Sequence, residues 1–118
     1  MKNRGFLARL GFAVAGIRIV WRREKSFRTQ SLFAVAATAG VIALRPGWAW
    51  AAIIGLCIAL VLTLEMVNAA LEYLIDKLHP EIAEEIKFAK DAAAGAVLIA
   101  SLASLVIGAL MLGALFMP

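Results

Sequence analysis

Residues 48–64 contain no charged side chain, and this run limits the folds open to the chain more than any other feature of its sequence. Two further apolar blocks lie at residues 31–44 and 91–116, and hydrophobic residues make up 64% of the chain. A helix that crosses a bilayer needs about 20 predominantly apolar residues, and soluble domains are much less hydrophobic. The sequence therefore predicts an all-α membrane protein, with one integral membrane domain over residues 1–118.

We expect three helices to cross the membrane, at about residues 28–45, 48–74 and 91–116. The segment before them has apolar residues at three- and four-residue spacing, with arginines between them. This pattern is typical of an amphipathic helix that lies on the inner leaflet, with its basic side toward anionic head groups. We predict such a surface helix over residues 5–25. It either only anchors the chain or also forms one wall of an interfacial site.

The positive charges predict how the chain crosses the membrane. Most lysines and arginines precede the first span, three lie at residues 76–90, and the connection between the first two spans holds only Arg45. Segments rich in Lys and Arg remain on the cytoplasmic side. We therefore expect a multi-pass protein with a cytoplasmic N-terminus, a cytoplasmic 76–90 connection and an external C-terminus.

Four polar side chains, here called the acidic face, interrupt the second predicted span: Glu65, Asn68, Glu72 and Asp76. Their spacing of i, i+3, i+7 and i+11 places them on one side of a helix. A carboxylate near hydrocarbon is costly and is normally retained for work with a partner. Glu65 lies roughly 16 Å deeper than Asp76 along the helix axis. Two carboxylates with an amide between them predict a site that binds a metal ion and takes a proton from a substrate.

The depth of each side chain suggests its chemistry. Glu65, the deepest carboxylate, lies where a lipid head group can reach it and suits a general base. Glu72 lies nearer to water and suits Mg²⁺, which prefers one or two carboxylates, phosphate oxygens and retained waters. Glu24, in the basic segment before the first span, can complete the metal site. Lys90 can meet a phosphate at the start of the third span, and Asp91 can cap that helix or orient the lysine.

Structural interpretations of these residues stay open. Polar side chains in a membrane also join helices through hydrogen bonds, which applies to Asn68, Glu65 and Glu72. Asp76 and Glu81 can be solvated loop charges. The third span is rich in small residues that allow close packing in lipid, and three short spans leave little interior. We therefore expect self-association, without a defined number of subunits.

The stretch LEMVNAALE at residues 64–72, followed by Asp76 and by AKDAAAGAVL at residues 89–98, resembles the prokaryotic diacylglycerol kinase family. The signature of that family is E-x-x-N-x-x-x-E, then a cytoplasmic loop and A-K-D, and its E-x-x-F-R stretch matches residues 24–28. The resemblance covers nearly the whole chain. It implies a homotrimer of the bacterial inner (cytoplasmic) membrane, with composite sites at the cytoplasmic interface. Its expected activity is the phosphorylation of diacylglycerol to phosphatidic acid with Mg²⁺ and ATP.

The resemblance also implies roles for individual residues. Glu65 corresponds to the catalytic base, and Glu24 and Glu72 correspond to the Mg²⁺ ligands. The residues that correspond to the ATP site are Glu24, Glu72, Glu81, Lys90 and Asp91. Those that correspond to lipid-substrate contacts are Arg4, Phe27, Arg28, Gln30, Glu65, Asn68 and Ala94. Gln30 stands where several members carry a glutamate, and Ala94 stands where some carry a serine.

Three other functions stay open. The Lys2-Asn3-Arg4 start and the Ala-Ala-Gly after Lys-Asp are similar to undecaprenol kinases as well, and rates on the two lipids separate these enzymes. A small proton-coupled transporter also carries a membrane carboxylate, although usually in the first of four spans. A non-catalytic membrane scaffold is the third alternative. ATP-dependent transfer of phosphate into lipid separates a kinase from the last two. We expect ATP, a membrane lipid and further copies of the chain as partners, and no nucleic acid.

Overall fold

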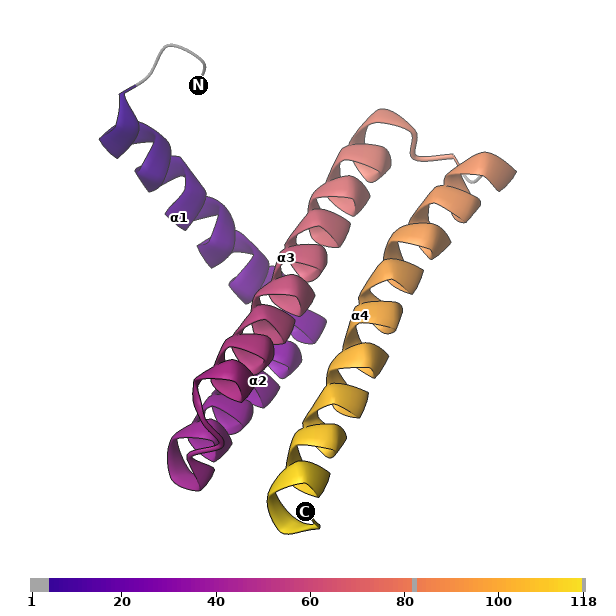
Figure 1. Ribbon diagram of the computed structural model, residues 1–118. Helices are drawn as coiled ribbons and strands as arrows, with labels where there is room; N and C mark the ends of the chain where they lie inside the picture. Colours follow the sequence, from indigo (N-terminus) through magenta and orange to yellow (C-terminus); the bar gives the residue numbers. More distant parts are fainter. Residues whose placement is uncertain (1–4, 82, 118) are drawn as a thin grey trace.

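The computed structural model describes residues 5–81 and 83–117, which form four helices (Figure 1). These are α1 (Phe6–Arg23), α2 (Lys25–Leu44), α3 (Trp48–Leu78) and α4 (Glu84–Phe116). By length and composition, α2, α3 and α4 could each cross a membrane. The predicted all-α fold with three long apolar helices is thus confirmed. The membrane-surface position of α1 stays a prediction, and Arg4 lies outside the described residues.

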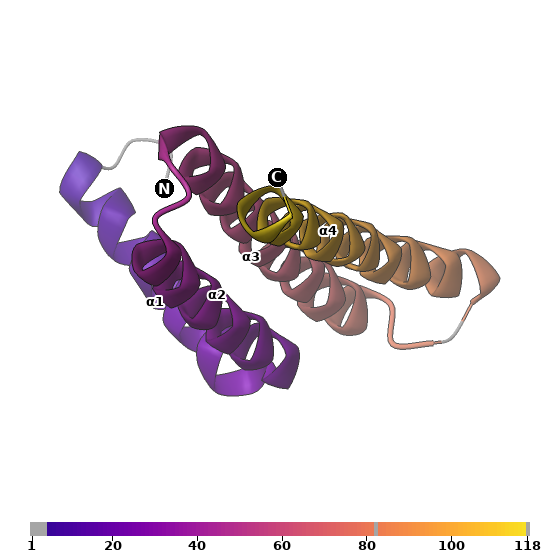
Figure 2. The ribbon, with the colours of Figure 1, turned by 60° about the horizontal axis from the view of Figure 1, so that its bottom comes forward.

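The central helix is α3, which packs against both α2 and α4. Helices α3 and α4 run side by side as a long antiparallel hairpin, whereas α1 diverges from the bundle at an angle (Figure 1, Figure 2). The turn at residues 45–47 and the C-terminal end of α4 lie at one end of the bundle, and the α3–α4 connection lies at the other (Figure 1). Gln30 Nε2 also joins α2 to α4, because it donates a 3.0 Å hydrogen bond to Ser101 Oγ. The orientation of the bundle across a membrane stays a prediction.

A one-residue elbow at Glu24 separates α1 from α2. The backbone of Glu24 is extended, with φ −109° and ψ 108°, so the helix does not continue through it. Its N–H donates to the Val20 oxygen at 2.8 Å and closes α1. The Arg28 guanidinium donates to the carbonyl oxygens of Trp21 and Arg22 at 2.7 and 2.9 Å. Carbonyls in the last turn have no partner within their own helix, so Arg28 satisfies two of them and holds the elbow.

A small hydrophobic cluster docks the elbow onto α3. Val20 of α1, Phe27 of α2 and Ala69 of α3 are buried together. The partly buried side chains packed against them are Leu62, Met66 and Tyr73. The small side chain of Ala69 allows the other two helices to approach α3 closely. The cluster therefore sets where the start of α2 lies along the helix that carries the acidic face.

The connection between α3 and α4 is shorter than the 76–90 segment predicted from the sequence. Helix α3 continues to Leu78 and α4 begins at Glu84, so only residues 79–83 link them. Helix α3 ends there because Pro80 disfavours the helical conformation in the residue before it. Acidic residues in the first turn of α4 complement the helix dipole and favour the early start. Most charged side chains of the 76–90 segment therefore belong to α3 or α4, and the two helices set their positions.

The turn between α2 and α3 holds Arg45 in the left-handed region, at φ 51° and ψ 59°. A β-branched residue fits this conformation poorly, because its side chain collides with the backbone. We expect Arg45→Val to lower the free energy of unfolding by roughly 1–2 kcal/mol, and Arg45→Gly to keep or raise it. Midpoints of thermal inactivation in detergent micelles measure the difference. An equal loss in both variants would point to the charge of the arginine instead of its conformation.

Candidate active site

Glu65 lies at the deep end of the acidic face and is 5% exposed, which makes it the one buried charged residue in the described part of the chain. Its Oε2 accepts a 3.0 Å hydrogen bond from Ser26 Oγ at the start of α2. A buried carboxylate without a hydrogen-bond donor is strongly unfavourable, so this contact stabilises it. The fold thus keeps a proton acceptor inside the helix bundle with a neutral partner.

One turn further along α3, Asn68 and Glu72 form a second contact. Asn68 Nδ2 donates a 3.4 Å hydrogen bond to Glu72 Oε1. Asn68 Oδ1 is buried and has no hydrogen-bond partner among residues 5–81 and 83–117. Buried polar atoms are nearly always paired, so this oxygen is an acceptor available to a ligand or a cation. The acidic face therefore carries accepting oxygen atoms along the length between Glu65 and Glu72.

The elbow brings another carboxylate, that of Glu24, toward α3. The Arg23 guanidinium, next to Glu24 in the sequence, lies 5.7 Å from the centre of the ring of Tyr73, which follows Glu72 on α3. The two predicted metal ligands are thus sequence neighbours of this contact, Glu24 at the elbow and Glu72 on α3. Their carboxylates and Asn68 Oδ1 are hard oxygen donors, which fits Mg²⁺.

The described residues contain no group of three or more His, Cys, Asp or Glu side chains placed to hold a metal ion. Mg²⁺ in nucleotide sites commonly takes only one or two carboxylates from the protein, because phosphate oxygens and water supply the other ligands. Glu24 and Glu72 match that smaller ligand set. Their assignment as ligands stays a prediction.

A pocket of about 450 Å³ lies between the end of α3 and the start of α4. Its lining residues are Glu72, Asp76, His79, Pro80, Glu81, Ile86, Lys87, Lys90, Asp91 and Ala94. The structure thus brings together every residue that the resemblance assigns to ATP except Glu24, which lies at the elbow. Ala94, assigned to the lipid, lies in the same pocket. His79 and Lys87 are pocket residues that the sequence analysis does not assign to the site.

Two lysines of the pocket are held by carboxylates. Lys90 Nζ lies 2.8 Å from Asp76 Oδ1, and Lys87 Nζ lies 2.7 Å from Asp91 Oδ2. The carboxylate that orients Lys90 is therefore Asp76 of α3, and not its neighbour Asp91. The spacing of i and i+4 between Lys87 and Asp91 is the sequence signal that could have identified their pairing.

The pocket as a whole is negative. Its lining holds four carboxylates and two lysines, which give a net charge of −2 with His79 neutral. His79 Nδ1 lies 2.9 Å from the backbone oxygen of Glu81 and 3.5 Å from its carboxylate. Anionic ligands are repelled by such a lining, and a bound divalent cation neutralises its net charge. The pocket therefore favours an anion that arrives together with a cation.

Lys90 precedes the predicted span at residues 91–116, and its pKa is raised above the usual 10.5. The main cause is its hydrogen bond to Asp76; desolvation opposes this effect, and the charges of Asp76 and Glu72 add smaller increases to the pKa. A raised lysine pKa means that the pairing stabilises the fold fully below pH 10.5. This stabilisation is lost as the pH rises through the raised value.

We expect Asp76→Asn to move the alkaline limb of the predicted nucleotide binding to lower pH. Without that carboxylate, the ammonium of Lys90 loses its proton more readily. Nucleotide affinity measured between about pH 8 and about pH 11 would show the shift. Asp91→Asn is the control, because Asp91 pairs with Lys87. An alkaline limb that moves equally in both variants would contradict the pairing of Lys90 with Asp76.

The residues that the resemblance assigns to lipid contacts gather only in part: Phe27 packs beside the stretch of α3 that carries Glu65 and Asn68, and the other described ones lie apart from it. Phe27 lies in the buried cluster at the elbow, Arg28 caps α1, and Gln30 joins α2 to α4. Ala94 lies in the charged pocket. Phe27, Arg28 and Gln30 thus each have a structural contact, and their contact with a lipid stays a prediction.

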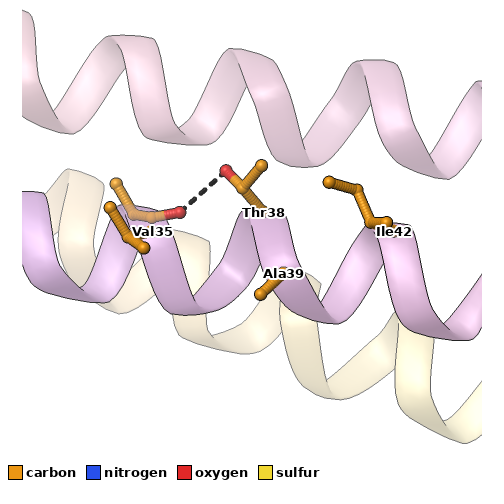
Figure 3. Close-up of a pocket in the computed structure, with 5 residues that line it drawn as sticks. Val35, Thr38, Ala39 and Ile42 are labelled. Carbon is orange, nitrogen blue, oxygen red and sulfur yellow. Dashed lines mark hydrogen bonds between the residues drawn. The ribbon is translucent and has the colours of Figure 1, made fainter.

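A second hollow of about 350 Å³ lies on α2, and no residue of the acidic face lines it (Figure 3). It is lined by Ala34, Val35, Thr38, Ala39 and Ile42. Thr38 Oγ1 donates to the Ala34 oxygen of its own helix at 2.8 Å, as the dashed line in Figure 3 shows. The lining therefore has no charged group, and its hydroxyl is already paired, so we assign it no chemistry.

Comparison with known proteins identifies similar sequences. The sequence profile of the family described as prokaryotic diacylglycerol kinase matches residues 11–112. The diacylglycerol kinase of Synechocystis sp. is 33% identical over 102 residues, which cover 86% of this chain and 58% of that relative. The chain thus spans less than two thirds of the length of this relative. The profile match includes the elbow, the acidic face and the whole charged pocket, and excludes Arg4.

Proposed function

The chain belongs to the prokaryotic diacylglycerol kinase family, and from this membership we propose that it transfers the terminal phosphoryl group of ATP to the hydroxyl of diacylglycerol. The product is phosphatidic acid, and the reaction takes place at the cytoplasmic interface of a bacterial inner membrane. One observation carries the proposal: the buried Glu65 shares a helix face with Glu72 of the charged pocket. A proton acceptor inside the bundle thus lies near a site suited to a metal-bound nucleotide.

Glu65 is the general base in this proposal. It accepts the proton of the lipid hydroxyl while the hydroxyl oxygen forms a bond to the terminal phosphorus of ATP. The bond between that phosphorus and the bridging oxygen breaks at the same time, and ADP leaves. Glu65 and Glu72 lie two turns apart, or roughly 10 Å along the helix axis, which leaves room for the reacting groups. The burial of Glu65 supports the role, because the acyl chains can then stay in the bilayer.

Glu24 and Glu72 would hold Mg²⁺, with Asn68 on the same face. When bound, the ion neutralises charge on the phosphates and orients them. One carboxylate comes from the elbow and the other from α3, so the docking of the elbow is a requirement for the complete site. The net negative charge of the pocket supports this reading, since it disfavours a nucleotide without a cation.

Lys90 would bind a phosphate oxygen, while Glu81 and Asp91 line the same pocket. Its ammonium contacts Asp76 at 2.8 Å. A lysine ammonium has three hydrogen-bond donors, so it can keep this contact and still bind a phosphate. Asp76 would then hold the lysine in the direction of the incoming nucleotide.

The active form in this proposal is a homotrimer with a cytoplasmic N-terminus and an external C-terminus. In the most apolar 18-residue stretch of each long helix, at most 17% is buried within one chain. Lipid and further copies of the chain can cover this surface, and the small residues of α4 allow close packing between copies. Composite active sites between subunits are what the family resemblance implies.

Transfer of phosphate into lipid tests this function directly. The full chain in mixed micelles receives Mg²⁺, ATP labelled in its terminal phosphate, and either diacylglycerol or undecaprenol. We expect label in phosphatidic acid, at a higher rate than in undecaprenyl phosphate. Label in neither lipid would contradict the proposed function, and a preference for undecaprenol would correct the substrate.

A further inference from the structure

The carboxylate of Glu65 is held from outside its own helix. Ser26, at the start of α2, donates its hydroxyl hydrogen to Oε2 at 3.0 Å, and this is the side-chain hydrogen bond that Glu65 makes among the described residues. Neither the composition of the acidic face nor the comparisons with known proteins point to Ser26. The two residues are 39 positions apart in the sequence and meet only in the folded chain.

We propose that Ser26 is a positioning residue, which fixes Oε2 of Glu65 and leaves Oε1 to accept the proton of the substrate hydroxyl. This inference rests on the proposed function of Glu65 as general base. The hydroxyl of Ser26 has a single hydrogen to donate, and it is directed at the carboxylate. The second carboxylate oxygen therefore keeps its accepting capacity.

A neutral donor suits this task better than a charged one. The terminal torsion of a glutamate side chain is broad, so an unheld carboxylate samples many orientations. A lysine or arginine would orient the group, but it would also pair with the negative charge that makes the group a proton acceptor. A serine hydroxyl restricts the torsion and leaves the charge in place. Glu72, two turns away, also has a neutral donor, the amide of Asn68, although this donor lies on the same helix.

The packing of the elbow explains why Ser26 reaches Glu65. Its neighbour Phe27 is buried against Ala69, which lies one turn after Glu65 on α3. The extended backbone of Glu24 starts α2 at this level. Ser26 itself is exposed, so the residue contributes little to the hydrophobic cluster. Loss of its hydroxyl should therefore leave the docking of the elbow intact.

The test compares Ser26→Ala, Ser26→Thr and wild type as full chains in the lipid phosphorylation assay. We expect Ser26→Ala to lower kcat about tenfold, which is the effect of one lost hydrogen bond on an oriented group, with KM for both substrates within about twofold. Ser26→Thr keeps the hydroxyl and should recover most of the rate. Ser104→Ala is the matched control, because within residues 5–81 and 83–117 the Ser104 hydroxyl donates to the Ala100 oxygen of its own helix, and it should leave kcat unchanged.

Two further readouts separate positioning from a purely structural contact. Ser26→Ala removes one hydrogen bond from a buried carboxylate, so its midpoint of thermal inactivation should fall slightly, and Ser26→Thr should restore the midpoint. The infrared carboxylate band of Glu65, assigned by its loss in Glu65→Gln, should shift in Ser26→Ala, and this readout does not depend on activity.

An unchanged kcat in Ser26→Ala would overturn the inference. A loss of kcat that follows a lowered midpoint and is not recovered in Ser26→Thr would overturn it too. An unshifted carboxylate band would show that Ser26 does not hold Glu65 and would overturn the inference, while the proposed function would stand. A wild-type chain that does not phosphorylate lipid would overturn the proposed function and, with it, the inference.

Discussion

Glu65→Gln should abolish lipid phosphorylation, with a fall in kcat of about 10²- to 10⁴-fold, while the chain still folds and binds nucleotide. Glutamine has nearly the shape of glutamate, and its amide oxygen can still accept the hydrogen bond from Ser26. The variant therefore keeps the buried contact that stabilises this position. An amide cannot take a proton at neutral pH, so the chemical step alone is lost.

Protection against thermal inactivation by Mg²⁺ and a non-hydrolysable ATP analogue measures nucleotide binding independently of turnover. We expect equal protection in Glu65→Gln and wild type. Glu84→Gln makes the same chemical change in the exposed first turn of α4 and should keep full activity. Near-normal kcat in Glu65→Gln would eliminate the assignment of Glu65 as the base.

Glu72→Ala should raise the Mg²⁺ concentration needed for half-maximal activity by at least about tenfold, because changes even beyond the direct ligands of a metal commonly weaken its binding by 10- to 100-fold. Glu72 lines the charged pocket, and the contact of Arg23 with Tyr73 joins the sequence neighbours of Glu24 and Glu72. With one of two carboxylates removed, the ion retains a single protein charge. Excess Mg²⁺ should restore a large part of the rate.

Asp76→Ala is the matched control for this prediction. It removes one negative charge from the same pocket, but Asp76 pairs with Lys90 and is not assigned to the metal. A general electrostatic effect would shift the Mg²⁺ titration equally in both variants. Equal shifts, or an unchanged titration in Glu72→Ala, would argue against direct binding of the ion by Glu72.

The acidic face is a part of the candidate site that the sequence alone predicts. Hydrophobicity predicts α3, and the 3.6-residue helical period places Glu65, Asn68 and Glu72 on one side of it. Both are local properties, which hold wherever the helix packs. The same reasoning misjudged the end of α3, because charged residues at 76–90 suit a solvated helix as well as a loop. In such a charged stretch, a helix-breaking residue such as Pro80 is the sequence signal that marks where the helix ends and the loop begins.

The partners of the charged and polar side chains could not be predicted from the sequence. Asp91 is next to Lys90 in the sequence, yet the hairpin of α3 and α4 brings Asp76 to that lysine and leaves Asp91 with Lys87. In the same way, Gln30 occupies a position associated with lipid contact but meets Ser101 on α4. Each pairing depends on the register between two helices, which no pattern within one helix contains.

The order of residues thus sufficed for the helices, the three long apolar segments, the shared face of the carboxylates and the family, because hydrophobicity, helical period and motif spacing are all properties of neighbouring residues. The elbow at Glu24, the burial of Glu65 and its contact with Ser26 required the folded chain. They arise from the docking of α1 and α2 onto α3 through Val20, Phe27 and Ala69. Contacts between distant segments follow from packing in three dimensions, and packing selects the group that meets each carboxylate.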